Sequence, residues 1–297
     1  DGTAKDEGIR VGVAAAAAML PARANDGYRG PFVFELRSEP GDWRPDTPTA
    51  LRPDPWVGNL QPFLIESPSQ FRSDGPNALT STAYAEDFDE VKELGSLTSA
   101  TRTADQTTAA IFWQTSFVNR LMRDLSAAEQ LSTVDEARLL ARLNLAYADA
   151  AIACWNDKYY WSFWRPLPAI READTDGNPA TLADPTWTPL FDPSTPTAPP
   201  LTNPPFPDHP SGHGCVSGAT FQTLRDFFGT DKIAFDVHSG RFPGQPRHFE
   251  TFSAALKEAI DARVWGGIHF RTADVQGSVI GKKVAHWVRK YYFQPVE

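Results

Sequence analysis

Apolar residues recur along most of this chain at intervals of three and four positions, which is the spacing of an amphipathic helix. The pattern predicts helices over residues 6–25, 83–97, 103–114, 119–130, from 133 onward, 211–228, about 249–269 and 272–292. No segment shows a convincing strand-like alternation of apolar and polar residues, and no internal repeat is present. We therefore expect an all-α fold, built as a helical bundle or bundles with long Pro-rich loops.

The helix that begins at Thr133 is the clearest of these. Thr133 and Glu136 have the spacing of a capping box, in which each side chain satisfies a free backbone amide of the first turn. Pro166 should end the helix, because the residue before a proline avoids the helical region. The stripe expected to be buried along it comprises Leu139, Leu140, Leu143, Ala146, Ala150 and Cys154.

Prolines, 26 in all, concentrate between the predicted helices. Apolar residues do not recur at a regular interval over residues 28–82, so we expect irregular structure wrapped over a core. Residues 178–210 form a loop far longer than ordinary connections, and loops of that length are generally functional or disordered. We predict two parts. Residues 1–130 are helical and irregular and could form an incomplete first bundle, and residues 131–297 form a C-terminal bundle that carries the oxyanion site.

Composition narrows the class of protein. The 297 residues carry a formal charge of −9, which argues against nucleic acid as the main partner, since phosphate backbones need clustered Lys and Arg. No run approaches the roughly 18 apolar residues of a membrane span. No secretory signal is recognised at the N-terminus, so the compartment stays open and includes secretion. For Cys154 and Cys215 we expect two buried thiols, with a single bridge as the alternative.

Candidate chemistry begins with two cations, Lys158 and Arg165, which lie seven residues apart with aromatic residues between them. On one continuous helix that spacing is two turns, so both would project from one face. Cations held among aromatic rings are poorly hydrated and grip an anion more strongly. The plainer interpretation is a pair of long side chains that extend to solvent at a helix end.

The second segment surrounds Ser211. Ser211 after a proline is typical of a helix N-cap, and the N-terminal amides of such a helix favour an anion. Gly212 allows an oxyanion to approach the backbone closely, and His213 then lies within reach as acid or base. Alternatives are a plain cap and a solvated histidine. His209 and His213 also have the spacing of a zinc pair, but a third ligand is missing nearby.

The third segment contains Arg263, a further cation, and His269. Gly266 and Gly267 between them allow a bend that would turn His269 toward the same anion. Alone, His269 is equally well explained as a histidine at a helix C-terminus, where it interacts with the helix dipole.

Taken in order, Lys-x6-Arg-Pro, Pro-Ser-Gly-His and Arg-x5-His form a specific signature. It resembles the motif shared by vanadium-dependent haloperoxidases, class A acid phosphatases and lipid phosphatases of the type 2 phosphatidic acid phosphatase superfamily. The resemblance covers roughly residues 146–287, and the one departure is Ala262 where the family usually has serine. The matched positions are Lys158, Arg165, Pro166, Pro210, Ser211, Gly212, His213, Arg263 and His269.

The resemblance implies a role for each group. The three cations, the Ser211 hydroxyl and the Gly212 amide would neutralise an oxyanion, and His213 would be the general acid–base. His269 would be the sole protein ligand of vanadium, or the nucleophile toward phosphorus. Vanadate is therefore the expected cofactor, and phosphate can occupy the same site.

The flanking residues favour chloroperoxidase-like bacterial members of the superfamily. Trp155 and Phe206 resemble the aromatic pair that lines the halide side of fungal chloroperoxidases, whereas algal bromoperoxidases have histidine at the Phe206 position. The alternative for both rings is core packing. We expect a haloperoxidase that uses hydrogen peroxide, a halide and a small organic acceptor. The competing hypotheses are a soluble acid phosphatase acting on phosphate esters and a non-catalytic anion-binding scaffold; halide preference and oligomeric state stay undetermined.

Overall fold

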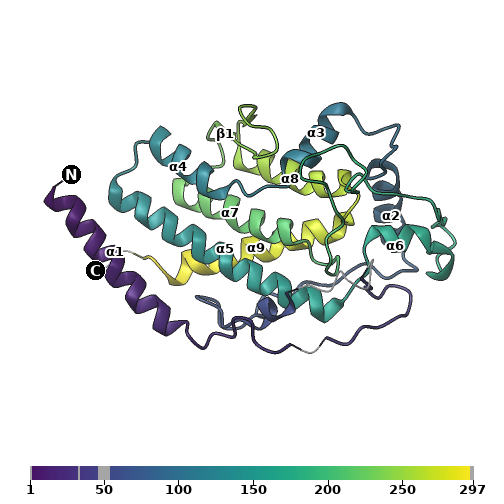
Figure 1. Ribbon diagram of the computed structural model, residues 1–297, viewed down its shortest axis with the longest axis horizontal. Helices are drawn as coiled ribbons and strands as arrows, with labels where there is room; N and C mark the ends of the chain where they lie inside the picture. The colour runs from purple at the N-terminus through teal and green to yellow at the C-terminus, as the bar shows by residue number, and fades with distance from the viewer. Residues whose placement is uncertain (1, 33, 46–53, 295–297) are drawn as a thin grey trace.

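The computed structural model describes residues 2–32, 34–45 and 54–294, and within these the expected all-α architecture is confirmed (Figure 1). Within the same ranges, no helix is both long and apolar enough to cross a membrane. The helices are α1 Thr3–Ala22, α2 Thr82–Leu94, α3 Ala104–Phe112, α4 Val118–Ala128, α5 Thr133–Trp161, α6 Pro166–Arg171, α7 Gly212–Phe228, α8 Phe252–Trp265 and α9 Arg271–Tyr291.

Several helix boundaries differ from the sequence prediction. The N-cap of α5 is Ser132 rather than Thr133, and its side chain accepts a hydrogen bond from the Asp135 amide. The helix ends at Trp161, five residues before the proline expected to end it, and Ser162 follows in the left-handed region. The predicted helix over 249–269 is shorter at both ends, since Phe249 belongs to a strand and His269 follows α8.

Short elements were not predicted, because each contains too few residues to show a repeating pattern of apolar positions. The strands β1 Phe235–Val237 and β2 Arg247–Phe249 form an antiparallel pair. Two 3-10 turns occur, η1 Pro55–Asn59 and η2 Ala173–Thr175. The expected irregular stretch over 28–82 is irregular apart from η1 and the turns, while residues 33 and 46–53 of it lie outside the described ranges.

This irregular stretch is fastened to the bundle by a buried carboxylate. Asp149 on α5 accepts hydrogen bonds from the amides of Phe63, Leu64 and Ile65 at 2.6, 2.7 and 2.9 Å. In contrast, α1 has no buried residue, and Figure 1 shows it at one end of the molecule, outside the stack of α5, α7 and α9.

Helices α7 and α9 pack closely against each other, and glycine makes this approach feasible. A methyl group built on Gly218 would lie 2.4 Å from the carbonyl oxygen of Ser278, and one on Gly281 would lie 2.0 Å from that of Cys215. Both distances are well inside van der Waals contact, so the backbones meet with no side chain between them. The start of α7 is thereby held rigidly beside α9.

The prediction that Cys154 and Cys215 are two buried thiols is wrong, and the alternative of a single bridge holds. The structure joins them in a disulfide between α5 and α7, with their Cα atoms 6.3 Å apart. Both side chains are fully buried where the two helices cross. The sequence could show that each is buried but not that they face each other across the same crossing.

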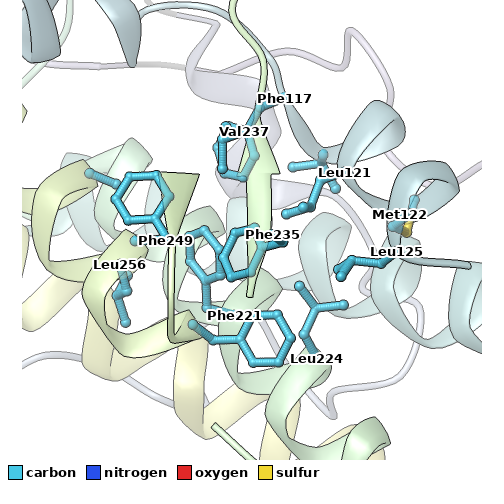
Figure 2. Packing of buried hydrophobic residues seen from close by; sticks show 14 of the residues in the cluster. Phe117, Leu121, Met122, Leu125, Phe221, Leu224, Phe235, Val237, Phe249 and Leu256 are labelled. Atoms are coloured by element: carbon cyan, nitrogen blue, oxygen red, sulfur yellow. The ribbon is translucent and has the colours of Figure 1, made fainter. Parts of the chain in front are cut away.

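A second feature that orients the functional end of the bundle is an aromatic cluster beneath the strand pair (Figure 2). Phe221 of α7 stacks on Phe117 with ring centroids 5.8 Å apart, and Phe235 of β1 packs against Phe249 of β2 at 5.9 Å. The cluster thus ties the short hairpin and the α3–α4 connection to the face of α7.

Candidate functional site

The predicted anion cradle forms at the start of α7. Ser211 is its N-cap, and its hydroxyl accepts a hydrogen bond from the Gly214 amide at 3.2 Å. Gly212 faces the Trp155 ring so closely that an added methyl would lie 3.0 Å from it. The N-terminus of this 17-residue helix favours a negatively charged ligand, and the Trp155 ring packs beside it.

A cavity of about 350 Å³ opens in front of this cradle. Of the nine residues predicted to form the site, six lie in its wall: Trp155, Phe206, Gly212, His213, Arg263 and His269. The other three, Lys158, Arg165 and Ser211, are buried and are not part of that wall.

Arg263 is the cation most available to a ligand. It lies near the end of α8, is 2% exposed, and its Nε and Nη1 have no hydrogen-bond partner within the described ranges. Its guanidinium carbon lies 5.2 Å from the centre of the Phe191 ring. Burial lowers the pKa of Arg263 to about 10, so the group stays charged at neutral pH. A buried, charged donor without an acceptor is costly, and an oxyanion would satisfy it.

Lys158 and Arg165 are organised differently from the sequence expectation. They do not share a helix face, because α5 ends at Trp161 and Arg165 is the extended N-cap residue of α6. Lys158 Nζ donates to the carbonyls of Pro207 and Asp208, both at 2.9 Å, and to that of Pro210.

Arg165 also binds backbone carbonyls. Its Nε donates to Phe206 at 2.7 Å and its Nη1 to Ile268 at 2.6 Å. Together with Lys158, it therefore anchors the loop before α7 and the segment before His269, while it adds positive charge behind the cavity. Burial, followed by repulsion from Arg165, lowers the pKa of Lys158.

His269 forms a buried pair that the sequence did not reveal. Its Nδ1 lies 2.7 Å from Oδ1 of Asp208, and the two side chains are 2% and 1% exposed. Burial, followed by repulsion from Arg165, lowers the pKa of His269, and burial raises the pKa of Asp208. With Nδ1 engaged, Nε2 is the ring nitrogen left for a ligand.

No function was predicted for Asp208 from the sequence. The available signal was its place, three residues before Ser211, between two prolines. Its partner His269 is 61 residues away in sequence, so no local pattern could pair them. Asp274, on the first turn of α9, was missed for the same reason; it is fully buried, and burial raises its pKa to about 7.

His213 lies in the first turn of α7 and lines the cavity. Burial, followed by repulsion from Arg263, lowers its pKa, while a hydrogen bond with the backbone of Trp113 opposes the shift. Its neighbour in the sequence pattern, His209, is used elsewhere: its Nε2 lies 3.0 Å from the Ser73 hydroxyl, and burial lowers its pKa to about 3.

The two predicted pocket aromatics lie against each other and against the cations. The centres of the Trp155 and Phe206 rings are 5.3 Å apart. Lys158 Nζ is 5.2 Å and the Arg165 guanidinium carbon 4.9 Å from the Phe206 ring centre. Phe206 therefore separates the cavity from two buried charges, a position with cation–π character on its inner face.

Several known proteins are similar to this chain in sequence. A family model described as the second helical-bundle domain of VCPO matches residues 138–297. A curated vanadium chloroperoxidase from Curvularia inaequalis is 26% identical over 279 residues, covering 73% of this chain and 45% of that protein. The chain thus spans about half the length of this relative.

Solved structures are similar as well. One described as the first bacterial vanadium-dependent iodoperoxidase has a TM-score of 0.68 and 27% identity, covering 85% of this chain and 61% of the other. Apo- and holo-type bacterial vanadium-dependent chloroperoxidases have TM-scores of 0.72 and 0.70 with 18% and 19% identity, which supports the fold. Because the family model covers more than half of the chain, this protein belongs to the family defined by the second helical-bundle domain of VCPO.

Proposed function

We propose that this protein is a vanadium-dependent haloperoxidase, which oxidises halide with hydrogen peroxide at a vanadate held by His269. One observation carries the proposal: a buried guanidinium with unsatisfied donors, Arg263, and a histidine oriented by a buried carboxylate line the same small cavity. These groups fit a tetrahedral oxyanion that needs one nitrogen ligand and several N–H donors.

His269 would supply the nitrogen ligand, and Asp208 would fix which nitrogen that is. The Asp208 carboxylate would accept a hydrogen bond from Nδ1–H, and this tautomer leaves the Nε2 lone pair for a ligand. The partner also restrains rotation of the ring. Asp208 is thus a positioning residue, acting through the histidine it holds.

The negative charge of the anion would be met by two kinds of group. Arg263 and the Gly212 amide face the cavity and can donate directly. Lys158 and Arg165 contribute positive potential from behind Phe206 while their N–H groups hold backbone carbonyls. Ser211, whose hydroxyl oxygen accepts a hydrogen bond from the Gly214 amide, caps the helix beside buried Asp274 and so holds the Gly212 amide in place.

When bound, vanadate would activate peroxide toward two-electron oxidation of a halide. The overall reaction converts halide, hydrogen peroxide and one proton into hypohalous acid and water. His213 is placed to handle that proton, because it lies in the cavity wall one residue from the cradle. Its lowered pKa keeps the free side chain neutral and ready to accept a proton. A small organic acceptor would then take up the halogen.

Trp155 and Phe206 would shape the halide side of the cavity. Aromatic walls beside positive charge suit a large, weakly hydrated anion and keep water away from it. The similar proteins are described as a chloroperoxidase and an iodoperoxidase, so the halide must be determined by experiment.

The test is a pair of assays on one preparation. With vanadate and peroxide, the protein should brominate or iodinate a phenolic dye, and His269→Ala should abolish the reaction. Without vanadate, hydrolysis of p-nitrophenyl phosphate should be absent or far slower. Rapid hydrolysis with no halogenation would instead establish the acid phosphatase alternative, in which His269 becomes phosphorylated. If neither activity is detected, the remaining hypothesis is a non-catalytic anion-binding scaffold.

A further inference from the structure

A second, larger cavity of about 880 Å³ lies at the opposite end of α7 from His213. It is bounded by the first part of α5 and by the last turns of α7 and α9. The 14 residues from His213 to Phe227 correspond to about 20 Å of helix, so the two cavities are separate. The charged groups in its wall are Asp135, Arg138, Arg142, Asp226, His286, Arg289 and Lys290.

Arg142 is the feature of this cavity that needs a ligand. It sits within α5, is 6% exposed, and its Nε has no hydrogen-bond partner. Among the residues that the structure describes, none forms an ion pair with it, and its nearest defined contact is the Phe227 ring, 6.0 Å from its guanidinium carbon. A buried guanidinium Nε without an acceptor is unfavourable, and an anion in the cavity would supply the acceptor.

Neighbouring charges increase that need. Arg138 is one helical turn from Arg142 on the same face of α5. Burial first, then Arg138, lowers the pKa of Arg142; Asp226 opposes the shift and Arg289 adds to it. Asp226 lies 3.3 Å from both Arg289 and His286, although its Oδ2 has no hydrogen-bond partner, and Asp135 accepts a hydrogen bond from the Ser132 hydroxyl.

The helix dipole accounts for some of the cations in the wall of this cavity but not for Arg142. Arg289 and Lys290 occupy the last turn of α9, where cations are favoured by the helix dipole without any ligand. Arg142 has no such explanation, since it lies well inside a 29-residue helix. The wall carries four Lys and Arg against two Asp, an excess of two positive charges that a dianion would balance.

We propose that this cavity is a second binding site, for a small oxyanion with two or more negative charges, held by Arg142 with Arg138 and Arg289. Guanidinium groups bind phosphate-like and carboxylate ligands through paired N–H donors. The site is independent of the vanadate site, so it stands or falls separately from the proposed function.

The test titrates inorganic phosphate by calorimetry into Arg263→Met, which removes the ligand-facing cation of the vanadate cavity. One phosphate should bind. Adding Arg142→Met should weaken that binding about tenfold or more, the loss expected for charged hydrogen bonds. Arg120→Met, which changes an exposed arginine paired with Asp124, is the matched control and should leave the affinity unchanged. Repeating the titration with citrate distinguishes phosphate from polycarboxylate ligands.

Thermal melting provides a readout that does not depend on affinity. In anion-free buffer Arg142→Met should melt no lower than wild type, because an unpaired buried charge has been removed. Phosphate should raise the melting temperature of Arg263→Met and fail to raise that of the double variant. Absence of phosphate binding to Arg263→Met, or equal binding by the double variant, overturns the proposal.

Discussion

The α7–α9 contact predicts a large effect from one methyl group. In Gly281→Ala the added carbon would begin 2.0 Å from the Cys215 carbonyl oxygen and 2.5 Å from the Ala219 nitrogen. Ordinary contact begins near 3.4 Å, so the first pair must separate by about 1.4 Å. Both obstacles are backbone atoms of α7, which cannot move aside as a side chain can. The whole helix must therefore shift.

The magnitude follows from two opposing effects. Over-packing of a filled core costs about 1–3 kcal/mol, and the rigid obstacles place this case at the upper end. Alanine regains about 1 kcal/mol of helix propensity over glycine. For a chain of 297 residues, a net loss of about 2 kcal/mol corresponds to a fall in melting temperature of about 3 °C.

The assay is thermal unfolding followed by circular dichroism, with Gly12→Ala as the control. Gly12 lies in α1, where an added methyl meets no atom within 4 Å, so its melting temperature should not fall. The displaced α7 should also carry His213 out of place and weaken vanadate binding. An unchanged melting temperature for Gly281→Ala would refute the close approach of α7 and α9.

Three further predictions concern the cavity. Asp208→Asn should leave the fold intact and weaken vanadate binding about 10–100-fold, measured by titration, because a neutral amide oxygen holds the Nδ1–H group of His269 less strongly than a carboxylate does; wild-type affinity would exclude a positioning role. A bound anion should raise the lowered pKa of His213, so vanadate affinity should increase as pH falls through the pKa of the complex and level off below that of the free protein. His213→Gln should remove that dependence, and a persisting slope would place the proton elsewhere. Phe206→His should reduce chloride turnover more than bromide turnover, since chloride is harder to oxidise; a proportional loss of both, with lower stability, would mark Phe206 as core packing.

Much of the candidate site could be predicted because its elements are local. Ser211, Gly212 and His213 are contiguous, and helix capping dictates what three such residues do at a helix start. The buried face of each helix is indicated by apolar residues every three or four positions, and Leu139, Leu143 and Ala146 are fully buried in the structure.

The remainder depends on contacts between distant segments. The Asp208–His269 pair and the Cys154–Cys215 bridge each join elements that meet only in the folded bundle. Arg165 shows the opposite problem: its place was predicted for a reason that proved wrong, since α5 ends before it. Sequence spacing gave the right neighbours there, while the backbone reaches them by a left-handed turn at Ser162.

The most direct test of the central claim is a crystal structure of the protein soaked with vanadate, with the metal located by anomalous scattering. The account predicts vanadium in the 350 Å³ cavity, within bonding distance of Nε2 of His269, with Arg263 donating to its oxygens. Crystals of His269→Ala should show no vanadium there. Vanadium bound elsewhere with this cavity empty, or bound equally well in His269→Ala, would contradict the account.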